Sequence, residues 1–370
     1  MTKKTPVNSS YRRKPVSSSS KPLDSGIRRN DGKRINQSFP EGTRSETLYS
    51  SALLLGKITV TEHERSRGRQ LFSGTRLKLL LFPFLHWLLK YTSVAIALIP
   101  MRILVWIMRV LYFWPGNPLR VSCEAVCLIA RREGHQHDPG KVYRQFLGNS
   151  FGVLENYFLL HRHGIGRISE RILLQERDAR MIRDLAEKHG GAMLAVPHNI
   201  ASAISALQLN RSFPLLVVAR NPPTISRTKV TLDFFEHMRV PVLMVRDGNP
   251  FELSRNLFTA FKTGMVIAAT LDNTENSDTR VDATMFGQQV GMTRWAVKIA
   301  TRKTLPVIPC YFSSKGNQHR IIVGEPIITD SIESAVQHYI SFFEHNILAD
   351  PASWAYLADK RWRRILSNAG

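Results

Sequence analysis

The chain has 370 residues and a mass of 42.1 kDa, with 43% hydrophobic and 22% charged residues, which are the proportions of a globular protein. This composition excludes a wholly disordered chain and a membrane protein built from many spanning helices. The formal net charge of +22 indicates an anionic partner, which leaves nucleic acid, anionic lipid and acidic substrates open. Three cysteines are too few for a disulfide framework and suit a reducing compartment.

The N-terminal part of the chain is strongly basic. Residues 1–78 hold 17 Lys and Arg against 6 Asp and Glu, which is half of the net charge. Because this stretch is rich in Ser, Pro, Asn and Gly, residues 1–70 are predicted to be a disordered basic tail. The segment LDSGIRRNDGKR within it is similar to translated intergenic repeats of bacteria, which leaves open that the native chain starts further downstream. No apolar core of a secretory signal peptide follows promptly.

The most apolar part of the chain is residues 79–115. Its charge-free run, 91–101, is shorter than the ~18–20 residues of a membrane-spanning helix. One interpretation is a bent or interfacial membrane anchor, with tryptophans near the headgroups; the other is a pair of buried helices in a soluble core. We favour the membrane, because helices of soluble proteins are rarely apolar on all sides. The basic residues between Arg65 and Lys78 indicate a cytoplasmic N-terminal side beside anionic lipid.

From about residue 190, short apolar runs alternate with helix-like segments. The apolar runs are 192–198, 214–220, 240–246, 265–272, 305–312 and 319–327, and the helix-like segments are 200–210, 224–238, 250–263, 292–303 and 331–347. Strands that are apolar throughout are typical of a sheet covered on both faces. The alternation predicts an α/β fold with a central, mostly parallel sheet flanked by helices. We assign this domain to residues 119–370, after an N-terminal membrane-associated helical segment at 75–118.

Polar residues close several of the apolar runs, and ligands of open α/β sheets bind at the carboxyl ends of strands. These residues are His198, Arg220, Arg246 and Asp272, although strands often end in polar surface residues. His198 is the candidate general base, because an imidazole with a pKa of about 6.5 can accept a proton from a hydroxyl. The sequence contains no nucleotide-binding glycine loop, paired zinc-binding motif or serine-hydrolase elbow. We therefore predict no metal and no cofactor.

Six segments occur in a characteristic order. They are FLGNSFGVLENYFLL (146–160), VPHN (196–199), VVARNPP (217–223), ATLDN (269–273), MFGQQVGMTRWAVKIATRKTLPVIPCYF (285–312) and DPASWAYLADKRWRR (350–364). With the apolar segment before them, they resemble the bacterial lipid A biosynthesis lauroyl/myristoyl acyltransferases, a branch of the lysophospholipid acyltransferase-like superfamily.

The resemblance implies an acyltransferase at the cytoplasmic face of the bacterial inner membrane. Such an enzyme transfers a fatty acyl chain from a thioester, acyl carrier protein or acyl-CoA, to a hydroxyl of a lipid A precursor or related glycolipid. The resemblance also implies that the thioester donor is the co-substrate, and that anionic membrane lipid and the glycolipid acceptor are partners. Nucleic acid is not expected as a partner, because no nucleic-acid-binding module occurs. Only the net charge favours a nucleic-acid-binding protein, which is the third candidate function.

The sequence departs from the family pattern at the central motif, His-x4-Asp/Glu. His198 matches the histidine, but the position of the acid is Ala203. Three explanations are open. Asn199 or Ser202 orients the imidazole weakly, a carboxylate distant in sequence does so, or the protein is a catalytically silent relative that binds lipid or acyl carrier protein.

Further site residues follow from the resemblance. Arg220, Arg239 and Arg246 are candidates for holding a phosphate of the lipid or of phosphopantetheine, because a guanidinium pairs bidentately with phosphate. Asp272 and Asn273 are expected to shape the pocket for the donor or the acceptor. A surface ion pair or a loop cap is the competing interpretation for each.

Overall fold

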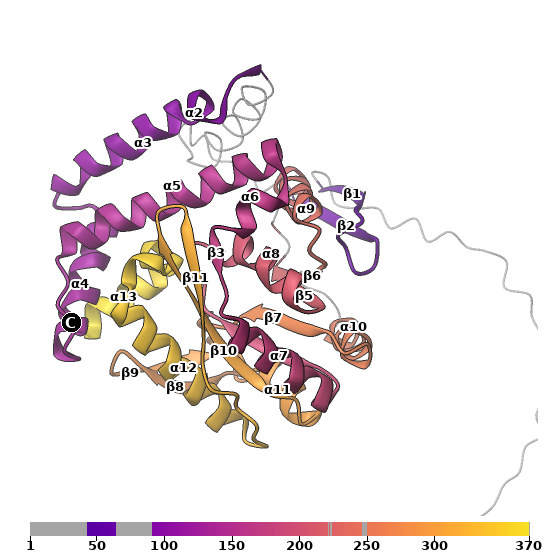
Figure 1. Cartoon of the computed structure of the whole chain (residues 1–370). Helices are drawn as coiled ribbons and strands as arrows, with labels where there is room; N and C mark the ends of the chain where they lie inside the picture. The colour runs from indigo at the N-terminus through magenta and orange to yellow at the C-terminus, as the bar shows by residue number, and fades with distance from the viewer. Residues whose placement is uncertain (1–42, 64–90, 221, 223, 246–249, 370) are drawn as a thin grey trace, which may run out of the picture. The chain divides into compact units, whose positions relative to one another are not determined.

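The computed structural model describes residues 43–63, 91–220, 222, 224–245 and 250–369 (Figure 1). The strands are β1 (Thr43–Tyr49), β2 (Lys57–His63), β3 (Ile172–Leu173), β4 (Ala192–Val196), β5 (Leu215–Arg220), β6 (Val242–Val245), β7 (Val266–Thr270), β8 (Val281–Met285), β9 (Gln288–Met292), β10 (Val307–Lys315) and β11 (Gln318–Val323). The helices are α2 (Val94–Ala97), α3 (Ile99–Val110), α4 (Pro118–Arg132), α5 (Pro139–His163), α6 (Ile165–Ser169), α7 (Glu176–His189), α8 (Ser202–Ser212), α9 (Ile225–Met238), α10 (Pro250–Lys262), α11 (Trp295–Arg302), α12 (Ile332–Ala349) and α13 (Lys360–Ala369). Short 3-10 turns cover Leu111–Phe113, Pro351–Ser353 and Ala355–Ala358.

The central element is a seven-stranded sheet with the order β3-β11-β10-β4-β7-β5-β6. β10 and β11 form an antiparallel pair, whereas the other neighbouring strands are parallel. The predicted α/β class with a mostly parallel sheet is therefore confirmed. The six predicted apolar runs correspond to β4, β5, β6, β7, β10 and β11.

The sheet is a middle layer between two hydrophobic cores, as β4 illustrates. Met193 and Ala195 pack into one core, whereas Leu194 and Val196 pack into the other. Helices α4, α11, α12 and α13 contribute to the first core, and α7, α8 and α9 contribute to the second (Figure 1). Successive side chains of a strand point to opposite faces of the sheet. Because both faces are covered, all of these side chains are apolar, which explains the continuous apolar runs.

An N-terminal hairpin corrects part of the predicted disorder. β1 and β2 pair antiparallel from Thr43↔His63 to Tyr49↔Lys57, so residues 43–63 are ordered although the prediction placed them in the basic tail. Residues 50–56 also contact the main sheet, where the main-chain N–H of Leu54 donates to the main-chain oxygen of Val242. The tail before residue 43 lies outside the described residues, and the domain boundaries proposed from the sequence remain predictions.

A second hairpin, β8–β9, was not predicted. Its two turn residues, Phe286 and Gly287, have φ values of 56° and 71°. Two left-handed residues are what a two-residue hairpin turn requires, because its backbone twist then matches that of the strands. The Phe286 main-chain N–H donates to the carboxylate of Glu344 on α12, which holds the unusual backbone in place.

The apolar segment is described from residue 91. Residues 94–113 form one helical stretch that is long and apolar enough to cross a membrane, judged by length and composition, and 11% of its most apolar window is buried. α3 has no buried residue, and Trp106 is 65% exposed, so this part of the chain does not supply the buried core helices of the alternative interpretation. The basic flank at 65–78 lies outside the described residues.

A close approach of α5 to the β10–β11 turn gives the first prediction. A β-carbon added to Gly152 would overlap main-chain atoms of Gly316, whereas one added to Gly148 meets no atom within 4 Å. Gly152→Ala is therefore expected to lower the free energy of unfolding by roughly 1–3 kcal/mol. Gly148→Ala, one helical turn away, is the matched control and should raise it by up to about 1 kcal/mol. Urea denaturation measures both, and equal effects of the two variants would contradict the prediction.

The buried His319 gives a prediction on pH. Its Nδ1 lies 3.0 Å from Ser314 Oγ and its Nε2 lies 2.9 Å from Asn156 Nδ2. Burial, together with the charge of Arg171, lowers the pKa of His319 from 6.5 to about 4. The unfolded chain therefore binds a proton before the folded protein does, so stability is complete above pH 6.5 and falls as the pH drops toward 4.

The expected loss from His319 is about 3 kcal/mol between pH 7 and pH 4, since one pKa unit corresponds to about 1.4 kcal/mol. Urea unfolding at several pH values measures it, with His319→Gln as the comparison because carboxylates titrate in the same range. The variant should show a flatter dependence of stability on pH. Identical slopes for the two proteins would refute this assignment.

Candidate active site

The register of two neighbouring strands places His198 beside Asp272. β4 and β7 are parallel, and Val196 pairs with Thr270 at their carboxyl ends. His198 and Asp272 each follow two residues later, so both side chains emerge at the same edge of the sheet. The Asp272 carboxylate Oδ1 lies 2.5 Å from Nδ1 of His198. The carboxylate distant in sequence, one of the three explanations above, is therefore present.

Asp272 is completely buried and is held by three further hydrogen bonds. Its Oδ2 accepts from the main-chain N–H of His198 at 2.9 Å and from Nε1 of Trp354 at 2.9 Å. Its main-chain oxygen accepts from Nε1 of Trp362 at 3.2 Å. Because Oδ2 already accepts two hydrogen bonds, Oδ1 is the carboxylate oxygen that faces Nδ1 of His198.

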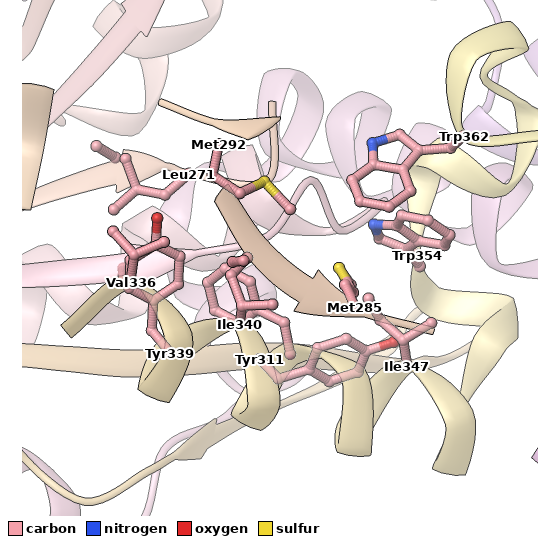
Figure 2. Close-up of a cluster of buried hydrophobic side chains, with 14 of the residues drawn as sticks. Leu271, Met285, Met292, Tyr311, Val336, Tyr339, Ile340, Ile347, Trp354 and Trp362 are labelled. Carbon is pink, nitrogen blue, oxygen red and sulfur yellow. The ribbon is translucent and has the colours of Figure 1, made fainter. Parts of the chain in front are cut away.

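Two tryptophans form the hydrophobic support of Asp272. Figure 2 shows Trp354 and Trp362 side by side next to Met285, and their ring centroids are 5.1 Å apart. Both indoles are almost fully buried, with exposed fractions of 0% and 1%, and Phe286 packs against both of them. The indole N–H groups are thus fixed in position by packing, which fixes the carboxylate.

The other ring nitrogen of His198 faces a tyrosine. The Tyr356 hydroxyl oxygen lies 3.1 Å from Nε2 and donates to Oδ1 of Asn273 at 2.6 Å, and the tyrosine ring stacks on the imidazole with centroids 4.1 Å apart. Burial, and next the charge of Asp272, raise the pKa of the Tyr356 phenol. Asp272, His198, Tyr356 and Asn273 therefore form one continuous row of hydrogen-bonding contacts.

His198 opens onto a cavity of about 860 Å³. Part of its wall comes from apolar side chains of β5, β7, α8, α9 and β10: Ala206, Leu209, Val217, Phe235, Ala268 and Phe312. Polar residues that follow β7, namely Asn273, Thr274, Glu275, Asn276 and Ser277, and two arginines, Arg220 and Arg361, also border it. The cavity therefore offers an apolar compartment and a polar, cationic region to one ligand.

A comparison with protein-family models matches residues 157–364, more than half of the chain, to the bacterial lipid A biosynthesis acyltransferases. The matched region contains the His198–Asp272 pair and both tryptophans. The chain belongs to this family. The family is bacterial and membrane-associated, and its activity is acyl transfer onto a lipid A-type acceptor. No curated protein matches the chain.

Two residues expected to orient the histidine have other roles in this acyltransferase. Asn199 is buried and bonds to Ser353 and Phe312, while the Ser202 hydroxyl bonds to main-chain atoms of Pro197 and Asn199. The prediction is corrected because α8 begins only at Ser202. His198 precedes the helix in a loop, so Ser202 does not lie one helical turn away on the same face. Ala203, in the position of the family's acid, lines the cavity.

The three predicted phosphate-binding arginines differ in their placement. Arg220 ends β5 and borders the cavity. Arg239 lies just after α9, which runs back along the sheet, so it is at the opposite edge, near the start of β6. Arg239 is not among the residues that line the cavity at His198, and its role in holding a phosphate stays a prediction. Arg246 lies outside the described residues.

Four side chains of this site were not predicted as site residues from the sequence: Trp354, Tyr356, Arg361 and Trp362. All lie in the segment DPASWAYLADKRWRR, which the resemblance singled out without assigning roles. The segment is brought to the site by hydrogen bonds across the chain, such as the Ala355 N–H donating to the main-chain oxygen of His198 at 2.6 Å. Its density of tryptophan among basic residues was the available signal. Asn273, which was predicted, does lie in the site, bonded to Tyr356.

Proposed function

We propose that the protein transfers a fatty acyl chain from an acyl thioester, carried by acyl carrier protein or by coenzyme A, to a hydroxyl of a lipid A precursor or related glycolipid. The observation that carries this proposal is the His198–Asp272 pair. A carboxylate on Nδ1 keeps the proton there and leaves the lone pair of Nε2 available to the substrate. This is the arrangement that a general base requires.

In the proposed reaction, Nε2 of His198 accepts the proton of the acceptor hydroxyl. The oxygen attacks the thioester carbonyl carbon, and the resulting tetrahedral intermediate breaks the carbon–sulfur bond. The thiolate takes the proton back from the imidazolium, giving an ester and a free thiol. Asp272 stabilises the imidazolium while it exists, and the acceptor hydroxyl takes the place that the Tyr356 phenol occupies at Nε2. The thioester is the co-substrate, and these steps use no metal or cofactor.

The cavity supports the substrate class. Its apolar walls between α8, α9 and the sheet suit a hydrocarbon chain, and burial of each CH₂ group contributes about 0.8 kcal/mol. Arg220 and Arg361 border the same cavity as His198 and Tyr356, so they bring positive charge to the wall of this cavity. We assign them to a phosphate of the acceptor or of the donor's phosphopantetheine.

We place the enzyme at the cytoplasmic face of the inner membrane, beside anionic lipid. The exposed apolar helix α3 and the turn after it support this placement, because Ile103 and Trp106 of α3 and Trp114 beyond it lie on the surface with 54%, 65% and 66% of their areas exposed. Apolar area of this kind favours insertion between lipid headgroups and acyl chains. The acceptor is then taken directly from the bilayer.

A silent relative that binds lipid or acyl carrier protein is the second candidate function. The absence of an acid at position 203 favours it, and the carboxylate of Asp272 on Nδ1 argues against it. The variant Ala203→Glu separates the two. An inactive parent that gains activity through this substitution would support the silent protein, whereas activity of the parent supports the enzyme.

The direct test uses the purified full-length protein in mixed micelles with a lipid A precursor. Acyl-carrier-protein and acyl-CoA donors of several chain lengths are compared, and the acylated product is identified by mass spectrometry. We expect one acyl chain to be added per acceptor, with free thiol released in equal amount. Thiol release without an acylated lipid, or no turnover with any donor, would contradict the proposal.

A further inference from the structure

A cluster of two histidines and one aspartate joins two helices next to the second hydrophobic core. His161 comes from the last turn of α5, while Asp233 and His237 lie four residues apart on α9. One possible ligand atom from each residue lies within 4.8 Å of the others. None of the three borders the cavity at His198.

The distances within this cluster approach those of a metal site. Nε2 of His161 lies 3.7 Å from Oδ2 of Asp233, and Nδ1 of His237 lies 3.3 Å from Oδ1. Ligands held 2.0–2.1 Å from a tetrahedral Zn²⁺ ion are separated by roughly 3.3 Å. The separations between each histidine nitrogen and the carboxylate are therefore within about 0.4 Å of the spacing in a zinc site.

The chemistry of the three ligands favours zinc over magnesium or calcium. Two imidazoles and one carboxylate suit a borderline-soft transition-metal ion, whereas magnesium and calcium prefer oxygen ligands alone. The two imidazole rings are 4.0 Å apart, so both are close enough to bind the same ion.

Access and support for an ion are both present. The side chains of Asp233 and His237 are 46% and 42% exposed, while that of His161 is 8% exposed, so an ion could enter from solvent and reach a ligand fixed by packing. Tyr157 packs edge-on against His161 and also against Phe234 of α9. Nδ1 of His237 donates to the main-chain oxygen of Asp233 at 2.7 Å, so the imidazole gives up this hydrogen bond when one of its nitrogens binds the ion.

We propose that His161, Asp233 and His237 bind one Zn²⁺ ion, with water completing the coordination, and that the ion ties α9 to α5. α9 carries Phe235, which lines the cavity, and Lys229, which pairs with Glu46 of the N-terminal hairpin at 2.6 Å. The ion therefore stabilises the helix that forms one wall of the cavity, and it takes no part in the acyl transfer.

The test uses the full-length protein, stripped of metal with a chelator and then titrated with Zn²⁺ against a chromophoric competitor. We expect one ion per chain and a higher melting temperature with zinc than without it. Co²⁺ in place of Zn²⁺ should give the visible absorption of a tetrahedral site. Asp233→Asn, which keeps the side-chain shape, and His237→Ala, which is on the surface, should each weaken zinc binding by more than 100-fold, beyond the 10–100-fold typical of losing an outer partner.

Two control variants separate this site from other histidines. His163→Ala removes an exposed histidine from the same end of α5, and His137→Ala removes one from the ring cluster of His135, His137 and His345. Both should leave the stoichiometry and affinity unchanged. Absence of stoichiometric binding, or binding that persists in Asp233→Asn and His237→Ala, would overturn the proposal.

Discussion

Asp272→Asn is expected to lower kcat by about 10⁴-fold while the protein remains folded. The asparagine oxygen can keep the two hydrogen bonds from the His198 main chain and from Trp354, since both donate to the same carboxylate oxygen. The amide NH₂ then faces Nδ1 and donates to it. Nδ1 loses its proton to Nε2, which can no longer act as a base, and the imidazolium loses its counter-charge. The same substitution in the Ser-His-Asp triad of serine proteases has this effect.

The measurement is steady-state acyl transfer with saturating donor and acceptor, accompanied by thermal unfolding. Asp282→Asn, at an exposed position of strand β8 where the aspartate pairs with Arg280, removes the same charge outside the site and should retain wild-type kcat. A value of kcat for Asp272→Asn within tenfold of the wild type would show that the carboxylate does not orient the base.

His198→Ala is expected to lower kcat by at least about 10⁴-fold, because the variant lacks the imidazole that accepts the proton of the acceptor hydroxyl. The main-chain N–H of residue 198 still donates to Asp272, so the buried carboxylate keeps one of its partners at this position. His345→Ala, an exposed histidine on α12, is the control. Single-turnover assays that follow both thiol release and lipid acylation give the rate of the chemical step.

The double variant adds a sharper criterion. If His198 and Asp272 act as one unit, removing both should cost little more than removing His198 alone, since the carboxylate acts only through the imidazole. Additive losses would show that Asp272 has a separate role. Undiminished turnover by His198→Ala would refute the proposed mechanism entirely.

Much of the fold was accessible from local patterns. Apolar runs such as 192–198 and 265–272 predicted the strands, because a sheet covered on both faces buries every residue of its central strands. The hairpin β8–β9 was missed because its turn depends on two left-handed residues, one of them Phe286, which has no strong preference for that conformation. The hairpin β1–β2 was missed because its residues are mostly polar, and its order depends on contacts with α9 and β6.

The candidate base followed from the same local patterns, since His198 ends an apolar run and matches a family motif. The pairing of this histidine with Asp272 did not follow from local patterns. A search limited to the helix after His198 reaches Ala203 and finds no acid, which suggested an incomplete site. The tryptophans that hold the carboxylate, Trp354 and Trp362, are 82 and 90 residues further along the chain from Asp272.

The amino-acid sequence contains the strands, most of the helices, the apolar helical segment and the candidate base, because each depends on neighbouring residues and on periodicity. The pairing of base and acid depends on which strands are adjacent in the sheet. β4 ends at Val196 and β7 starts at Val266, yet the two strands are neighbours in the sheet. The 69 residues between them are far more than local sequence patterns can bridge. Strand order is set by the packing of both faces together, so only the folded chain brings His198 and Asp272 into one hydrogen bond.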